Sequence, residues 1–179
     1  MNSTRLELLQ HLKDDYKFKY FLTVTFCRNS PNSDKDIERF IRIIHTNLFT
    51  RNYLKQRKLL GIAVVREQKE ILSERNHYHI LIEEKENVDL IDLAKAICKA
   101  TTNCDSIRSI PEKDYEKILV NNDPNNKENN TTIKLAEIPT ADLERTINYV
   151  LKQGYKDNYE YLHLATGKNH ESYFPIITG

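Results

Sequence analysis

Two histidines separated by one residue, His77 and His79, are the side chains of this sequence with the clearest capacity for chemistry. An apolar run at residues 80–82 follows them and predicts a buried strand entered from a polar turn. Side chains alternate between the two faces of a strand, so both imidazoles share one face, about 6–7 Å apart. Neutral imidazoles at that spacing can converge on one divalent metal ion, although a half-exposed polar face would give the same pattern.

A third metal ligand is expected from a neighbouring strand. The apolar run at 59–65 predicts that strand, and Glu67 comes shortly after it. If the two strands pair as a hairpin, Glu67 returns beside the histidines. Glu70 and Glu74, in the polar segment between the strands, are the alternatives for this place, or they are solvated loop charges. Two histidines and one carboxylate suit Mn²⁺ or Mg²⁺, with positions left open for water and substrate oxygens.

The sequence resembles the HUH endonucleases, which comprise rolling-circle replication initiators and related relaxases and transposases, in three stretches that occur in the family's order. Residues 20–26 are similar to the first motif strand of the family. The histidine pair, with Tyr78 between its members, is similar to the histidine–hydrophobic–histidine motif. Residues 148–152 are similar to the third motif, because Tyr149 is followed three residues later by Lys152. The motif does not fix the third metal ligand, and no helicase segment follows.

The resemblance implies an enzyme that nicks and joins single-stranded DNA through a 5′-phosphotyrosine link and leaves a free 3′-hydroxyl. Tyr149 would be the nucleophile and Lys152 its assistant. The metal, held by His77, His79 and Glu67, would grip the scissile phosphate. The implied substrate is an origin hairpin of a plasmid or phage, cut to start rolling-circle replication, with a separate host helicase as a further partner. A transposase of the same superfamily is one alternative, and a non-catalytic nucleic-acid-binding domain is the other.

A basic segment with one tyrosine, residues 51–58, predicts contact with DNA, because it can hold a single-stranded backbone and stack a base. A solvated linker is the competing interpretation. Residues 1–66 carry 13 lysines and arginines against 6 acidic residues, a charge of +7, whereas the whole chain sums to +1. The basic half favours phosphate contact, and the small net charge argues against indiscriminate coating of duplexes. The predicted DNA-binding residues are Arg51, Tyr53, Lys55, Arg57 and Lys58.

The remaining pattern predicts a single domain, residues 1–179, of the α+β class. We expect a central antiparallel sheet of about five strands, similar to a ferredoxin or an RNA-recognition fold, with helices on its faces. Tyr149 falls outside the apolar stripe of its helix, and Gly154 is expected to end that helix before Tyr155, which makes Tyr155 an unsuitable second nucleophile. Helical spacing is found within residues 1–19, 34–48, 87–99 and 139–154, and strand-like runs at 20–27, 59–67, 77–84, 131–138 and 159–164, with a further short strand expected at 106–110.

Composition excludes several classes of protein. With 179 residues the chain has room for one core but not for an added motor domain. It contains no apolar run of membrane-spanning length and no signal-peptide core near its first residue, so a soluble, cytoplasmic protein without a membrane partner is expected. Three scattered cysteines predict reduced thiols rather than disulfides or a zinc knuckle. The other four histidines are expected to be structural or exposed.

Overall fold

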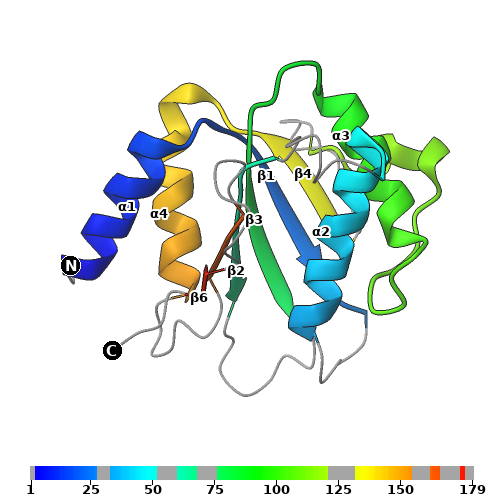
Figure 1. Cartoon of the computed structure of the whole chain (residues 1–179), viewed down its shortest axis with the longest axis horizontal. Coiled ribbons are helices and arrows are strands. Elements are labelled where there is room, and N and C mark those ends of the chain that lie inside the picture. Colours follow the sequence, from blue (N-terminus) through cyan, green and yellow to red (C-terminus); the bar gives the residue numbers. More distant parts are fainter. Residues whose placement is uncertain are drawn as a thin grey trace.

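The computed structural model describes residues 3–27, 33–51, 60–67, 76–120, 132–154, 162–165 and 174–175. Its centre is an antiparallel sheet with the strand order β4-β1-β3-β2-β5-β6 (Figure 1). The α+β class and the central antiparallel sheet with flanking helices are therefore confirmed. The strands are β1 Phe18–Thr25, β2 Ile62–Glu67, β3 His77–Glu83, β4 Ile133–Glu137, β5 Leu162–Ala165 and the two-residue β6 Phe174–Pro175.

Within the described residues, four α-helices accompany the sheet, and the chain order through its centre is β1-α2-β2-β3-α3-β4. The start of α3 shows how the sequence sets a helix boundary: the Asp89 carboxylate accepts a hydrogen bond from the Asp92 backbone N–H at 2.7 Å and caps the first turn. The helices are α1 Ser3–Asp15, α2 Ser33–Phe49, α3 Leu90–Thr101 and α4 Leu143–Gly154, with 3-10 helices η1 Glu112–Ile118 and η2 Thr140–Asp142.

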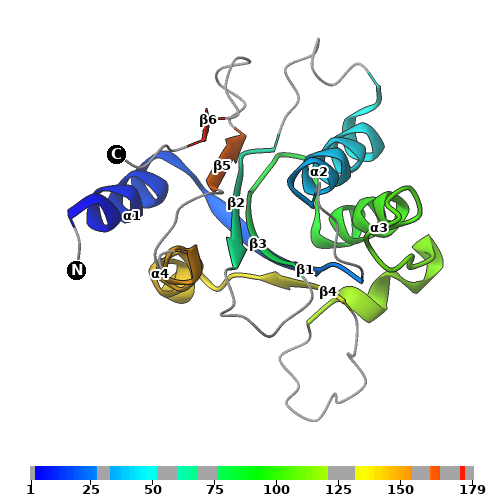
Figure 2. The ribbon, with the colours of Figure 1, turned by 90° about the horizontal axis from the view of Figure 1, so that it is seen from below.

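Helices α2 and α3 cover one face of the sheet and bury the larger of two hydrophobic clusters (Figure 2). Strand alternation supplies the sheet side of this cluster: Leu22 and Val24 of β1 and Ile80 of β3 are fully buried. The apolar stripe of α2 supplies the other side, with Ile37 and Phe40 also fully buried. This face is a continuous apolar core.

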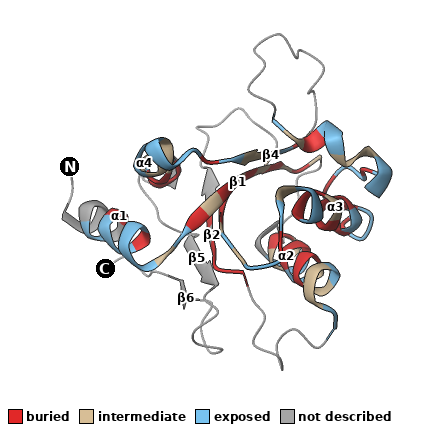
Figure 3. Ribbon diagram, turned by 90° about the horizontal axis from the view of Figure 1, so that it is seen from above, coloured by how far each residue is buried: buried red, intermediate tan, exposed pale blue. Residues whose placement is uncertain are grey.

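Helices α1 and α4 cover the opposite face, where the buried cluster is smaller. Leu81 of β3, Leu12 of α1, and Ile147 and Leu151 of α4 belong to this cluster. Phe18 joins this cluster because a register irregularity between Phe18 and Tyr20 separates it from the alternation of the rest of β1. Figure 3 shows the buried residues of α2 and α3 on the side of each helix that faces the sheet.

Three segments differ from the sequence prediction. The prediction of a strand at 106–110 is wrong, because these residues form no strand. The Ile110 backbone N–H donates to the Thr101 side-chain hydroxyl at 2.8 Å instead of to a strand partner. Helix η1 was not predicted, because a 3-10 helix of seven residues that buries only Ile118 leaves almost no apolar periodicity. The strand at β1 also begins earlier than expected, at Phe18 rather than Tyr20.

Candidate active site on the α1/α4 face of the sheet

The histidine strand lies between β1 and β2, and β2 is the hairpin partner that the sequence predicted. On one side β1 pairs with β3 so that Thr23 lies opposite His79 and Thr25 opposite His77. On the other side β2 pairs with β3, and Glu67 lies opposite His77. The predicted hairpin and its register are thereby confirmed. Directly opposed residues of antiparallel strands share a face, so positions 25, 77 and 67 form one row across three strands.

Threonine hydroxyls of β1 contact both imidazoles. The Thr25 Oγ1 lies 3.2 Å from Nδ1 and 3.1 Å from Nε2 of His77, and the Thr23 Oγ1 lies 3.5 Å from Nδ1 of His79. His79 is buried, with 4% of its surface exposed, and His77 is half-buried. A hydroxyl beside a ring nitrogen orients the imidazole and selects its tautomer, which is the role that supporting residues have around a metal-binding histidine.

Two aromatic rings contact the ring of the buried His79. The Phe21 ring stacks on the His79 ring with 5.6 Å between centroids and an interplanar angle of 19°. The Tyr149 ring of α4 meets the His79 ring edge-on, at 5.5 Å and 70°. Tyr149 keeps 45% of its surface exposed, as its place outside the apolar stripe predicted. Helix α4 therefore holds an exposed tyrosine against the histidine strand.

Lys152 follows Tyr149 in the last turn of α4 and is exposed. Residues three apart on a helix are surface neighbours, with about 5–6 Å between Cβ atoms. The helix ends at Gly154, as predicted, and Tyr155 lies outside the described residues. An ammonium group is thus available on the tyrosine side of α4.

The proposed metal ligands are only partly within the described side chains. Among those side chains, no three histidine, cysteine, aspartate or glutamate residues gather closely enough to hold a metal ion. The Glu67 side chain and the whole of Glu70 and Glu74 are outside them, so the register of Glu67 is the available observation. Two imidazoles on one face and a carboxylate-bearing residue directly opposite one of them form a donor set that suits Mn²⁺ or Mg²⁺.

The predicted DNA-binding segment is largely outside the described residues as well. Arg51 is exposed just beyond the end of α2. Tyr53, Lys55, Arg57 and Lys58 fall in the undescribed range 52–59, so their part in DNA contact stays a prediction.

A groove of about 300 Å³ adjoins the site, and we call it the Tyr149 groove. Sequence reasoning missed it, although Phe21 lies two residues before Thr23 on the same face of β1, and Arg145 lies one helical turn before Tyr149. These two spacings were the signals in the sequence that could have indicated the groove. The residues that line the groove include Phe21, Ala136, Ile138, Pro139, Arg145 and Tyr149.

No known relative was found. No protein-family model, curated protein or solved structure matches the chain. The arrangement of residues described above therefore carries the functional argument.

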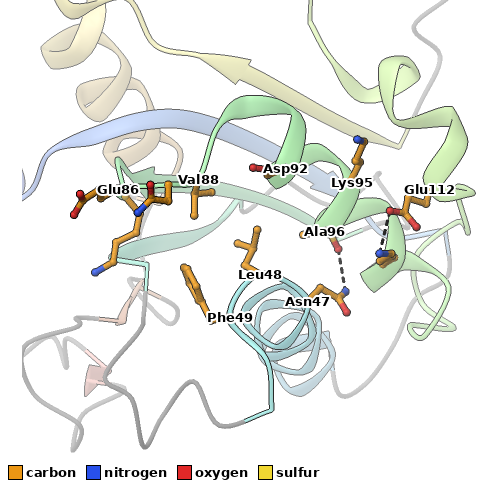
Figure 4. A pocket seen from close by; sticks show the side chains of 12 residues that line it. Asn47, Leu48, Phe49, Glu86, Val88, Asp92, Lys95, Ala96 and Glu112 are labelled. Atoms are coloured by element: carbon orange, nitrogen blue, oxygen red, sulfur yellow. Dashed lines mark hydrogen bonds and ion pairs between the residues drawn. The ribbon is translucent and has the colours of Figure 1, made fainter.

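A larger cavity, of about 560 Å³, lies on the other face of the sheet, between the end of α2 and α3 (Figure 4). Two interactions join residues of its lining: the Asn47 Nδ2 donates to the Ala96 carbonyl at 3.2 Å, and Lys99 pairs with Glu112 at 3.0 Å. It contains none of the predicted site residues. Within the described part of the chain, no helix has the length and apolar character needed to span a bilayer.

Proposed function

We propose that this protein is a single-tyrosine endonuclease of the HUH type, which nicks and rejoins single-stranded DNA through a 5′-phosphotyrosine intermediate. The observation that carries the proposal is the contact between Tyr149 and His79, with ring centroids 5.5 Å apart. These two residues lie 70 positions apart in the chain, in stretches that resemble two different motifs of one family. Of the ten tyrosines in the sequence, Tyr149 is the one that resembles the third motif, and its ring contacts a histidine of the second.

The topology supports the same family. The order β1-α2-β2-β3-α3-β4 with sheet order β4-β1-β3-β2 is the split βαβ arrangement of ferredoxin-like and RNA-recognition-like folds. In this arrangement β1 and β3 are central, so residues on them are flanked by sheet on both sides. The three motifs fall on β1, on β3 and on α4, the helix that covers the β1/β3 face bearing the histidines.

Each residue then has a role in phosphodiester transfer. The Tyr149 hydroxyl loses its proton and its oxygen forms a bond to phosphorus, while the bond from phosphorus to the 3′ oxygen breaks. That oxygen takes up one proton and leaves as a 3′-hydroxyl, so the transfer consumes no net proton. Lys152 places positive charge where the phenolate and the phosphate carry negative charge. His77, His79 and Glu67 would hold Mn²⁺ or Mg²⁺, which supplies Lewis-acid stabilisation of the phosphate oxygens when bound. Thr23 and Thr25 orient the imidazoles.

The substrate we propose is single-stranded DNA in an origin hairpin of a plasmid or phage, cut to start rolling-circle replication. Resealing is the reverse of cleavage and needs the same residues, so one site serves both steps. The ring contacts and the topology suit a replication initiator and a transposase of the superfamily equally. A covalent product distinguishes both from a domain that only binds single strands.

The test is incubation of the protein with a pool of single-stranded oligonucleotides of random sequence and Mn²⁺, followed by a denaturing gel and mass spectrometry of the shifted band. We expect a DNA-linked peptide that contains Tyr149. Tyr149→Phe removes one oxygen and keeps the ring, so it should form no adduct while it still binds DNA. Tyr155→Phe is the matched control and should form the adduct. Absence of an adduct in the wild type, or its persistence in Tyr149→Phe with loss in Tyr155→Phe, would contradict the assignment.

A further inference from the structure

We propose that the Tyr149 groove binds a nucleobase of the DNA strand that Tyr149 attacks, namely the base next to the scissile phosphate. This inference rests on the proposed function and adds to it a binding site for a specific part of the substrate. Four features of the groove carry it: its shared walls, its floor, its size and its distribution of charge.

The walls of the groove are also walls of the catalytic site. Phe21 and Tyr149 line the groove, and both rings contact His79 on the histidine strand. Their own ring planes meet at 88°, with 6.3 Å between centroids. Two rings at a right angle form a corner in which a flat base can stack on one ring and meet the edge of the other. Because Tyr149 borders both spaces, a strand whose phosphate reaches its hydroxyl passes the mouth of the groove at the neighbouring nucleotide.

The floor is apolar and small. Ala136, which lies opposite Phe21 in the β1–β4 ladder, lines it together with Ile138 and Pro139. A volume of about 300 Å³ is at the lower end of the range of ligand pockets, roughly 300–1,000 Å³. The groove therefore suits one nucleobase and not a folded length of strand.

The charges determine which part of a nucleotide enters. The carboxylates of Glu137 and Asp142 also line the groove, and Glu137 is only partly offset by Lys19, whose Nζ lies 3.8 Å from the Glu137 Oε1. Carboxylates repel a phosphate and tolerate a neutral base. Arg145 is an exposed cation of the lining and forms no ion pair among the described residues. The base is thus expected inside the groove, with a backbone phosphate beside Arg145.

The first measurement fills the groove. Ala136→Leu adds side-chain volume to the floor without changing any proposed catalytic residue, and Ala141→Leu adds the same volume at an exposed position of η2 outside the lining. Binding of fluorescently labelled, random-sequence single strands is followed by anisotropy in EDTA, so that no cleavage intervenes. We expect Ala136→Leu to weaken binding about tenfold, the scale of one stacked base, and Ala141→Leu to leave it unchanged.

The second measurement locates the base. The strand recovered in the wild-type adduct is resynthesised with an abasic site at each position in turn. One position next to the cut should weaken binding to the wild type about tenfold and should have no further effect on Ala136→Leu. If Ala136→Leu does not fold, Arg145→Gln is used instead, with Arg42→Gln on the other face as its control; only Arg145→Gln should reduce the salt dependence of binding.

The outcomes separate the two proposals. An adduct in the wild type together with full binding by Ala136→Leu, or by Arg145→Gln where that variant replaces it, would overturn the groove assignment and leave the endonuclease intact. An abasic effect that persists in Ala136→Leu would likewise place the base elsewhere. Groove-dependent binding without any adduct in Mn²⁺ would overturn the endonuclease and retain a base-binding groove.

Discussion

Alternate residues of β3 enter two different environments. Tyr78 and Ile80 point into the apolar core under α2 and α3, where both are fully buried. His77 and His79 belong to the other face, where their contacts are threonine hydroxyls, a phenylalanine ring and a tyrosine ring. One strand of seven residues thus serves stability with one set of side chains and a polar site with the other.

The difference lies in how completely each face is covered. On the α2/α3 face, apolar side chains of two helices meet a continuous apolar sheet surface. On the α1/α4 face, the apolar contacts are centred on Leu81, and the end of the sheet that carries the histidines meets the half-exposed Tyr149 instead. The close apolar packing of the α2/α3 face stabilises the fold, whereas the other face leaves a half-exposed tyrosine beside the histidines. Substitutions on the two faces should therefore have separable consequences.

The largest effect on function without a matching effect on stability is expected for His77, the half-buried histidine. His77→Ala removes a ligand, so Mn²⁺ affinity should fall by more than the roughly 10–100-fold that loss of a supporting residue costs, and no DNA adduct should form. Its melting temperature should change little. Calorimetric titration with Mn²⁺ and thermal melting together check this, with the exposed His11→Ala as control. Undiminished Mn²⁺ affinity would remove the metal assignment.

The reciprocal change is Ile80→Ala, three residues further along β3 and on the other face. It deletes fully buried methyl groups and leaves a cavity, so the free energy of unfolding should fall by about 2–5 kcal/mol. Mn²⁺ affinity of the remaining folded protein should be unaltered. Urea denaturation gives the stability and calorimetry gives the affinity. A large change in metal affinity would mean that the two faces are not independent.

A smaller effect is expected from the threonines that contact the imidazoles. Thr25→Val keeps the β-branched shape and removes the hydroxyl that lies 3.1–3.2 Å from the His77 ring nitrogens, so Mn²⁺ affinity should fall about tenfold. Thr23→Val removes a longer contact, of 3.5 Å, and should have the lesser effect. Equal affinities of both variants and the wild type would show that the hydroxyls do not position the rings.

The smallest expected effect is a pH dependence of stability that arises from His45, a histidine of α2. His45 is buried. Its Nε2 accepts from the Leu60 backbone N–H at 3.1 Å, so its Nδ1 carries the proton and donates to the Ile41 carbonyl at 2.9 Å. Burial lowers the pKa of His45 below 6.5, against the opposing effect of the hydrogen bond to the Ile41 carbonyl.

The unfolded chain therefore binds a proton at His45 more readily than the folded protein does. The contribution of neutral His45 to the free energy of unfolding is fully present above pH 6.5 and should decrease as the pH falls below that value. Denaturation curves measured across this range should show a smaller decrease for His45→Gln. An equal slope in both proteins would assign the effect to other groups.

The sequence by itself determined the local elements and much of the site. Apolar alternation and helical spacing depend on neighbouring residues only, which is why β1, β3, α2 and α3 were predicted close to their true bounds. The hairpin register that brings Glu67 opposite His77 also followed from sequence, because the two runs adjoin in the chain. The exposure of Tyr149 followed from the angle at which it leaves the apolar stripe of its helix.

Only the tertiary structure decided how α4 lies against the sheet. The angle of a helix on a sheet depends on the packing of Leu81 with side chains of α1 and α4, which are distant in sequence, and no local pattern encodes it. That packing places Tyr149 edge-on to His79 and creates the Tyr149 groove between Phe21 and Arg145. Spacing within the sequence can supply the candidates for a nucleophile and its ligands. Their meeting depends on contacts between elements that the chain brings together only when it folds.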